Sequence, residues 1–364
     1  MCTELNTNIE VIVGTYEEFL LGYKLCFSPS SKIGYSLQTS FTNHGHTASV
    51  RSLASSTKHL ASGGADETIR LFNMKTRQEV GTLIQHDGTV TCMEFLDSSH
   101  LVSGSEDGTI CVWTTNNWQC VKTLRGHKDG IISLSAHPTG KLLLSIGKDK
   151  TLRTWNLIKG RSAYVTNIKA VGEFVLWSPD GSKFLVSLKN RIDVYSVKTT
   201  GIIHSIDFGR RASCATFLND HVLVVGGESN KLELHDITRK CALQMFEAHK
   251  NRIKGLYCVR NFGTKQSNSL VLSTSSDGFI KVWKFKSSKL DEHPSLLTEL
   301  DTTCRPTCLT VCYESPIRKA VTQPSLDVSS PKEELQTSEI AVYENKRKRN
   351  SSTKSSLKKK KKII

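Results

Sequence analysis

The chain of 364 residues has no apolar run of the roughly 18 to 20 residues that a membrane-spanning helix requires. Its start, MCTELNTNIE, lacks the basic segment and following apolar stretch of a secretion signal. These absences argue against a membrane-spanning or secreted protein. Hydrophobic residues make up 38% and charged residues 23% of the chain, so it has enough apolar material for a core and is not disordered throughout.

The 11 cysteines include no CxxC pair. They are odd in number and lie mostly in strand-like segments such as VTCMEF and TICVW, which indicates buried thiols in a reducing compartment rather than a disulfide framework. Cys304, Cys308 and Cys312 are evenly spaced, but no histidine or CxxC pair accompanies them. We therefore expect no metal site and no cofactor.

The sequence also lacks helical periodicity. It contains an internal repeat instead. An aromatic residue or its substitute closes each of six units, at steps of 41, 42, 40, 40 and 48 residues: Phe72, Trp113, Trp155, Tyr195, His235 and Trp283. A period of about 40 fits four short strands with their turns. The last step is longer because of a polar insertion at 261–269, which we expect to be a surface loop.

Each unit contains an apolar run, a turn and an alternating run. The segment LVSGSEDGTICVW (101–113) shows this pattern, with an Asp-Gly turn that tolerates positive φ. Segments 60–72, 142–155 and 271–283 repeat it. Regularly spaced short strands predict an all-β radial array.

These units resemble the WD40 family, in which a His, a Ser or Thr, an Asp and a Trp form a hydrogen-bonded set within a blade. The complete sets are His86, Ser103, Asp107, Trp113; His127, Ser145, Asp149, Trp155; and His249, Ser273, Asp277, Trp283. A fourth set, His46, Ser62, Asp66 and Phe72, lacks the indole donor. A Ser-His-Asp hydrolase uses the same residue types, but three nearly identical copies cannot all be active sites and no G-x-S-x-G motif is present. We therefore expect these four sets of residues to have a structural role, and we expect no catalytic residue and no enzymatic activity.

Two middle units carry Lys189 and Ser229 where the aspartate would stand. Their strands and turns are kept, so we expect these blades to form without the anchor and to be less rigid.

Segments at both ends of the repeats predict a further blade. Three strand candidates precede the six units, in IVGTYEEFLLGYKL and YSLQTSF, and one follows them, in RPTCLTVCYE. Joining them would remove exposed sheet edges. We predict a flexible N-terminus at 1–10 and a seven-bladed WD40 β-propeller over 11–313, closed by N- and C-terminal strands, with an incomplete six-bladed ring as the alternative.

The positive charge is concentrated at the C-terminal end. The formal net charge is +15, and residues 315–364 carry +8 of it, from 13 Lys or Arg and 5 Asp or Glu. Prolines, serines and threonines over 314–345 predict a disordered linker, and 346–364 form a basic tail. Two clusters resemble a bipartite nuclear localisation signal: Lys346, Arg347, Lys348, Arg349 and Lys358, Lys359, Lys360, Lys361, Lys362.

We expect this tail to bind a nuclear import receptor. A purely solvating role and nonspecific contact with rRNA phosphates remain open, whereas the absence of interleaved aromatics argues against reading of an RNA sequence.

The face that bears the aspartate turns is the usual WD40 contact surface. Aligning the units places these charged candidates there: Arg51, Glu106, Lys148, Arg211, Arg252 and Lys254. Basic residues prevail, which suits an acidic peptide or the rRNA backbone; an ordinary solvated rim is the alternative.

Four segments resemble one particular group of WD40 proteins. They are VGTYEEFLLGYKL (13–25), HPTGKLLLSIGKDKTLRTWNLIKGRSAYV (137–165), RIDVY (191–195) and SSDGFIKVWKF (275–285). With the Lys-rich C-terminus, they resemble the p21-activated kinase-interacting WD-repeat proteins. This resemblance implies a non-enzymatic nucleolar scaffold for large (60S) ribosomal subunit biogenesis and pre-rRNA processing, with assembly factors and pre-60S particles as partners. The alternative it implies is negative regulation of a p21-activated kinase by direct binding.

Overall fold

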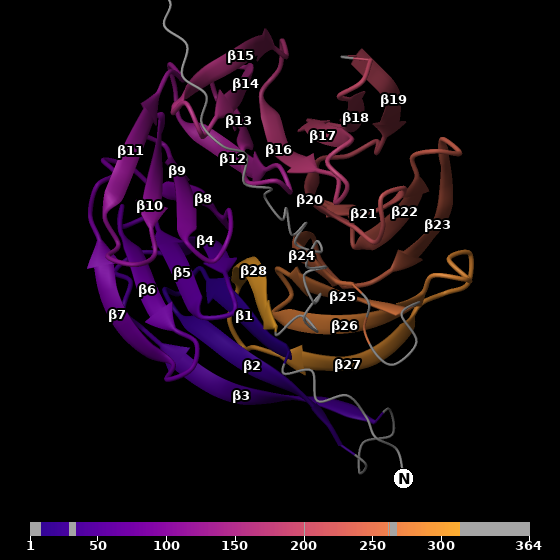
Figure 1. Ribbon diagram of the computed structural model, residues 1–364. Helices are drawn as coiled ribbons and strands as arrows, with labels where there is room; N and C mark the ends of the chain where they lie inside the picture. The colour runs from indigo at the N-terminus through magenta and orange to yellow at the C-terminus, as the bar shows by residue number, and fades with distance from the viewer. Residues whose placement is uncertain (1–8, 29–33, 200, 261, 263–267, 314–364) are drawn as a thin grey trace, which may run out of the picture. The chain divides into compact units, whose positions relative to one another are not determined.

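A computed structural model of the protein describes residues 9–28, 34–199, 201–260, 262 and 268–313. All regular elements within these ranges are β-strands, so this part of the chain has no helix that could span a membrane. The strands form seven four-stranded antiparallel sheets arranged as blades around an axis (Figure 1). The predicted all-β, seven-bladed propeller is confirmed.

Six blades follow one another along the chain. Blade 1 contains β4 (Val50–Ser55), β5 (His59–Gly64), β6 (Ile69–Asn73) and β7 (Gln78–Leu83). Blade 2 contains β8 (Val90–Phe95), β9 (His100–Ser105), β10 (Thr109–Thr114) and β11 (Cys120–Arg125). Blade 3 contains β12 (Ile131–Ala136), β13 (Leu142–Gly147), β14 (Thr151–Asn156) and β15 (Arg161–Asn167).

The other three consecutive blades have the same strand order. Blade 4 contains β16 (Gly172–Trp177), β17 (Lys183–Leu188), β18 (Arg191–Ser196) and β19 (Gly201–Asp207). Blade 5 contains β20 (Ala212–Phe217), β21 (Val222–Gly227), β22 (Lys231–Asp236) and β23 (Cys241–Glu247). Blade 6 contains β24 (Ile253–Val259), β25 (Asn268–Ser275), β26 (Phe279–Lys286) and β27 (Ser295–Asp301).

Blade 7 combines both ends of the repeat region. Its strands, from the axis outward, are β28 (Pro306–Tyr313), β1 (Ile9–Thr15), β2 (Leu20–Phe27) and β3 (Tyr35–Asn43). β28 and β1 pair antiparallel, with Val11 opposite Val311 and Ile9 opposite Tyr313. The chain therefore closes the ring by hydrogen bonds between its two ends, as the sequence predicts.

Two predicted boundaries shift. β1 begins at Ile9, inside the segment predicted to be flexible, because Ile9 is buried against Tyr313 and Glu10 is held by Arg77. The last two residues of the predicted insertion, Asn268 and Ser269, begin β25, and 261 and 263–267 lie outside the described residues. The predicted linker and basic tail also lie outside them.

The core lies between neighbouring blades. One cluster, for example, joins Leu71 of blade 1 to Val90, Leu101 and Trp113 of blade 2, all nearly inaccessible to solvent. The innermost strands contact one another in the order β4, β8, β12, β16, β20, β24, β28 and back to β4. Each blade is therefore clamped between two others, which stiffens the ring.

A β-bulge recurs near the start of every innermost strand. In each sheet the register shifts by one residue there, so that one residue opposes none on the second strand. Such a bulge re-aims the extra side chain. The seven bulge residues are Arg51, Thr91, Ile132, Glu173, Ser213, Lys254 and Thr307.

Candidate functional site

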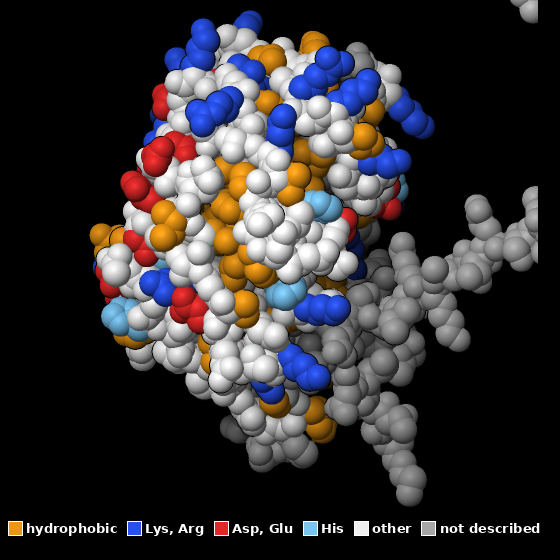
Figure 2. Space-filling view, turned by 60° about the vertical axis from the view of Figure 1, so that its left-hand side comes forward, with side chains coloured by type: hydrophobic (Ala, Val, Ile, Leu, Met, Phe, Trp, Pro, Cys, Tyr) orange, Lys and Arg blue, Asp and Glu red, His pale blue; other side chains and the backbone are white. Residues whose placement is uncertain are grey.

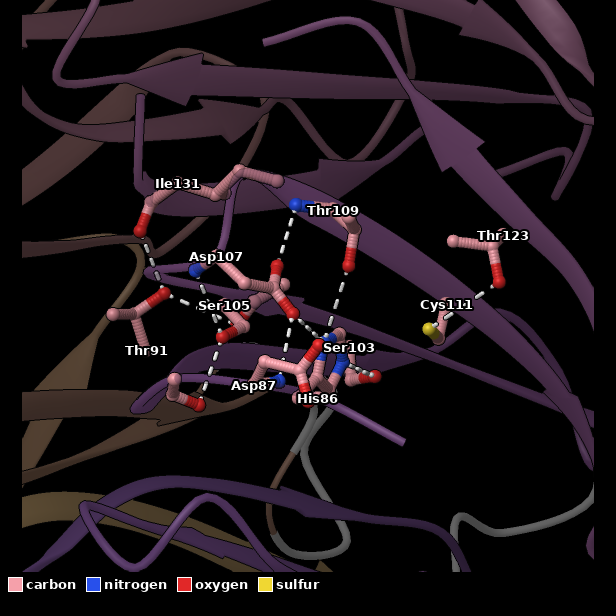
Figure 3. A network of polar contacts seen from close by, with 12 residues as sticks. His86, Asp87, Thr91, Ser103, Ser105, Asp107, Thr109, Cys111, Thr123 and Ile131 are labelled. Carbon is pink, nitrogen blue, oxygen red and sulfur yellow. Dashed lines mark hydrogen bonds and ion pairs between the residues drawn. The ribbon is translucent and has the colours of Figure 1, made fainter. Parts of the chain in front are cut away.

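A polar network in blade 2 connects four predicted residues, of which Figure 3 shows His86, Ser103 and Asp107. His86 Nδ1 lies 3.0 Å from Asp107 Oδ2, and His86 Nε2 lies 2.8 Å from Ser103 Oγ. Trp113 Nε1 donates to the same hydroxyl at 2.9 Å. The network therefore runs from the turn between β9 and β10 through the blade to the indole of β10.

The Asp107 carboxylate also holds backbone. It accepts the N–H of Asp87, in the loop before β8, at 3.2 Å, and the N–H of Thr109 at 2.6 Å. Gly108, between the aspartate and Thr109, has φ 78°, which a glycine adopts without strain. One carboxylate thus fastens the entering loop to the turn.

The network recurs in blades 3 and 6. In blade 3, His127 Nε2 lies 2.7 Å and Trp155 Nε1 2.8 Å from Ser145 Oγ, and His127 Nδ1 lies 3.0 Å from Asp149. In blade 6, His249 Nε2 lies 2.8 Å and Trp283 Nε1 3.0 Å from Ser273 Oγ, and the backbone N–H of Lys250 donates to Asp277 at 2.9 Å.

Blade 1 has the shortened network that the sequence predicts. His46 lies 2.9 Å from Asp66 and 2.8 Å from Ser62 Oγ. Phe72 occupies the position of the tryptophan, 1% exposed, and has no N–H to donate.

The sequence analysis missed a fifth member, the threonine two residues after the aspartate. Thr151 Oγ1 donates to Asp149 at 2.8 Å and lies 3.2 Å from His127 Nδ1, and Thr109 lies 3.3 Å from His86 Nδ1. A threonine recurs at this position in DETIR, DGTIC and DKTLR, so the sequence alone could have predicted this member of the network.

Blade 6 has Phe279 at that position and so lacks the hydroxyl. His249 Nδ1 stands 3.3 Å from Asp277 Oδ2 without a hydrogen bond and has no other partner among the described residues. Burial lowers the pKa of His249 to about 4, although the Asp277 charge opposes this shift. His249 is therefore held neutral at physiological pH.

Blades 4 and 5 contain no such network among the described residues, and polar pairs within each of these blades are local. Asp193 and Ser205, on β18 and β19, are joined at 2.7 Å, and His235 and Glu233 pair at 3.0 Å within β22. Within the described ranges, no side-chain hydrogen bond links the turns at Lys189 and Ser229 to the loops that enter these blades. The lost aspartate therefore has no side-chain substitute there.

In blade 7 a different pair of residues, Glu17 and Arg305, joins a turn to the loop that enters the blade. Glu17, in the turn between β1 and β2, accepts the backbone N–H of Arg305 at 2.9 Å and its side-chain Nε at 2.9 Å. The Arg305 guanidinium also lies over the Tyr16 ring, 4.3 Å from its centroid. This pair joins the turn of the N-terminal strands to the loop that leads into β28.

The four histidines of the networks have side chains that are 0–1% exposed. Burial alone would raise the pKa of Asp107, but hydrogen bonds from Thr109 and His86 outweigh it and hold that pKa below its usual value. A buried imidazole beside a carboxylate whose pKa is lowered stabilises the loops and offers no surface to a substrate. The described residues also contain no group of three potential ligands placed to hold a metal ion.

The predicted binding face separates into paired and unpaired charges. Lys148 Nζ lies 2.7 Å from Glu106, so these two candidates neutralise each other. Arg211 pairs with Glu173 at 2.6 Å. Arg252 Nε donates to Ser276 Oγ at 3.1 Å. Arg51 and Lys254 form neither an ion pair nor a hydrogen bond through their side chains within the described part of the chain.

The outer side of the ring presents an apolar surface that the repeat pattern does not predict. Figure 2 turns the β11 side toward the viewer and shows hydrophobic side chains gathered in a band, with Lys and Arg around it. Between blades 2 and 3, Val121 and Ile158, 59% and 73% exposed, help line a groove of about 280 Å³. Residues from two blades form it, so no single repeat reveals it.

A pocket of about 630 Å³ lies between blades 7 and 1. Lys24, Lys58 and Lys75 line it, together with the ion pair between Arg77 and Glu10, whose atoms Nε and Oε1 are 3.0 Å apart. Segments that are distant in the sequence line this pocket, so the repeat pattern does not predict it.

Comparison with known proteins agrees with this architecture. The family model "WD domain, G-beta repeat" matches residues 35–73, 77–114, 118–156 and 240–284. A protein of Danio rerio, "p21-activated protein kinase-interacting protein 1-like", is 43% identical over 90% of this chain and 87% of its own length. The chain belongs to the p21-activated protein kinase-interacting protein 1 family.

Two further relatives extend this family match. The human "p21-activated protein kinase-interacting protein 1" is 38% identical over 83% of this chain and 77% of its own length. "Protein MAK11" of Saccharomyces cerevisiae is 28% identical over 84% of this chain and 83% of its own.

The family membership agrees with the buried polar networks, because the WD40 propeller is typically a non-catalytic scaffold. The WD-domain matches pass over most of blades 4 and 5, the blades that carry Lys189 and Ser229. Each match begins near an outer strand and ends in the third strand of the next blade, as for residues 35–73 from β3 to β6. The sequence repeat is thus offset by one strand from the structural blade.

Proposed function

We propose that this protein is a non-enzymatic scaffold in the nucleus and nucleolus that assists large (60S) ribosomal subunit biogenesis and pre-rRNA processing. The observation that carries the proposal is the combination, in one chain, of a closed propeller with the two basic clusters at 346–349 and 358–362. The resemblance to the p21-activated kinase-interacting WD-repeat proteins supports the same role.

The mechanism rests on rigidity. Four blades have their entering loops fastened by a buried carboxylate, and blade 7 has the Glu17–Arg305 pair. Loops that are already ordered lose little conformational entropy when a partner binds. The ring would hold assembly factors on pre-60S particles in a fixed geometry, and the tail would bind a nuclear import receptor and make nonspecific contacts with rRNA.

Depletion followed by sucrose-gradient profiling of ribosomal subunits tests the role. We expect free large subunits to fall and full-length protein to restore them. A chain ending at residue 315 should restore them only when a substitute import signal is attached. A normal profile after depletion would refute the proposal and leave kinase regulation as the leading function.

Kinase binding is the second candidate, and the names of the zebrafish and human relatives favour it. In this role the propeller would bind a p21-activated kinase directly and lower its activity. Purified full-length protein should then reduce phosphorylation of a model substrate by the kinase in proportion to complex formation. No complex in sedimentation and no change in kinase activity would exclude this role.

A further inference from the structure

Two of the seven bulge residues are cations, and they flank one strand. Arg51 lies on β4 and Lys254 on β24, and the innermost strands of blades 6, 7 and 1 follow one another as β24, β28 and β4. The bulge residue of β28, Thr307, donates to the carbonyl of Val50 at 2.5 Å, which ties β28 to β4 directly beside Arg51. The two cations therefore belong to one small region near the axis.

Two further cations precede innermost strands in the same region. Arg211 comes immediately before β20 and Arg252 immediately before β24. Burial, followed by the positive charges of Arg252, Arg211 and Arg51, lowers the pKa of the Lys254 ammonium. All four charges are thus close enough to repel one another, and we call Arg51, Arg211, Arg252 and Lys254 the axial cluster.

The acidic side chains of this face balance only part of that charge. Glu173 pairs with Arg211, and Glu228 also lies near enough to Arg211 to act on its charge. Glu106 pairs with Lys148 and also feels the charge of Arg51, so five cations of this face meet three carboxylates. Lys254 is half-buried, so water screens its charge less than that of an exposed lysine. Bringing an anion to Lys254 and Arg51 would replace repulsion by attraction, which is the electrostatic condition for specific recognition.

We propose that the axial cluster binds a carboxylate-rich segment of a partner protein, with Lys254 and Arg51 each pairing with a carboxylate on either side of β28. This inference concerns the ring alone and holds whether or not the protein acts in ribosome assembly. An extended peptide places alternate side chains about 6.6 Å apart, so a short stretch presents several carboxylates to a compact cluster.

The distribution of charge favours a peptide over nucleic acid. The other bulge residues are Thr91, Ile132, Ser213 and Thr307, which are neutral, and Glu173, which is acidic. A nucleic-acid backbone carries a charge at every nucleotide and is usually followed by a long basic stripe or by stacking aromatics. The axial cluster is compact and contains no aromatic residue.

The test uses the full-length protein and a fluorescent peptide of alternating Glu and Ser, with a Gln-Ser peptide as the neutral control. Fluorescence anisotropy at about 0.15 M salt, where distant surface charges are screened, measures affinity. Carbodiimide coupling, which joins a peptide carboxylate to a lysine amine, followed by mass spectrometry, shows which lysine the peptide contacts. The basic tail is present in every variant, so its contribution is constant.

The variants are Lys254→Met and Arg51→Gln, and the matched control is Lys148→Met, a lysine of the same face that is paired with Glu106. We expect coupling at Lys254 and about tenfold weaker binding for Lys254→Met, because a half-buried charge pair would be lost. Lys148→Met should change affinity less than about twofold. Lys254→Met removes a repelled charge, so its thermal midpoint should not fall, which separates lost binding from unfolding.

Three results would overturn the proposal. The first is equal affinity of Lys254→Met and Lys148→Met, and the second is coupling confined to lysines outside the axial cluster. The third is displacement of the peptide by a single-stranded oligouridylate at a lower concentration than by unlabelled peptide, which would assign the axial cluster to nucleic acid.

Discussion

Replacing Asp107 by Ala should lower the free energy of unfolding by about 2–6 kcal/mol. The Asp107 side chain is 12% exposed and accepts hydrogen bonds from the backbone N–H groups of Asp87 and Thr109 and from His86. A buried donor left without an acceptor costs about 1–3 kcal/mol. Water can replace the carboxylate at the exposed Asp87 N–H, so two of the three lost contacts carry the cost.

Thermal denaturation followed by circular dichroism and tryptophan fluorescence measures this effect. For a domain of this size, the loss corresponds to a fall in Tm of roughly 3–9 °C. The matched control is Asp87→Ala, which removes an exposed carboxylate from the same loop and keeps the backbone N–H that Asp107 accepts. Equal Tm values for the two variants would refute the view that the buried carboxylate holds blade 2 together.

Three further predictions concern the serine of the polar network, the stability of the protein in acid, and the closure of the ring by β28. Ser103→Ala should destabilise the protein by about 1 kcal/mol more than Ser62→Ala in urea unfolding, because the Ser103 hydroxyl bonds to an imidazole and accepts from an indole, whereas Ser62 bonds to an imidazole only; equal losses would contradict this. The pKa of His249 is about 4 in the folded protein against 6.5 ordinarily, so the unfolded chain binds that proton first and the free energy of unfolding should fall by up to about 3 kcal/mol from pH 6.5 to 4. His249→Gln should flatten this dependence, and an unchanged slope would count against the buried neutral imidazole. A chain ending at Arg305 lacks β28 and should aggregate, whereas one ending at Tyr313 should show the far-UV spectrum and Tm of the full chain; a soluble, cooperatively unfolding shorter chain would show that closure is dispensable.

The repeat carries most of the fold information. Because the Ser-to-Asp and Asp-to-Trp spacings are constant, aligning a few residues such as Asp107 and Trp113 sets the strands of a whole blade. The seventh blade also follows from the sequence, since three strands at one end and one at the other complete a sheet. The structure adds the register of this sheet, in which Val11 lies opposite Val311.

Contacts that depend on side-chain geometry are harder to predict from the sequence. Lys148 and Glu106 both belong to the aspartate-turn face by alignment, yet only three-dimensional proximity between neighbouring blades shows that they neutralise each other. The Glu17–Arg305 pair joins residues 288 positions apart and follows no repeat. The bulge that sets Lys254 apart from its neighbours depends on strand register, which a composition or spacing pattern does not specify.

The pairing of β1 with β28 imposes an order on synthesis. At about 5–20 residues per second, the ribosome needs roughly 15–60 s to go from one strand to the other. During that interval β1, whose seven residues are all buried in the finished ring, has no partner on one edge. A nascent chain therefore exposes an unpaired strand edge, which can pair with other chains. The two basic clusters follow β28 in the chain, so a polypeptide interrupted before the ring can close is released without them. Under the nuclear import role proposed above for these clusters, that order would exclude incomplete chains from transport.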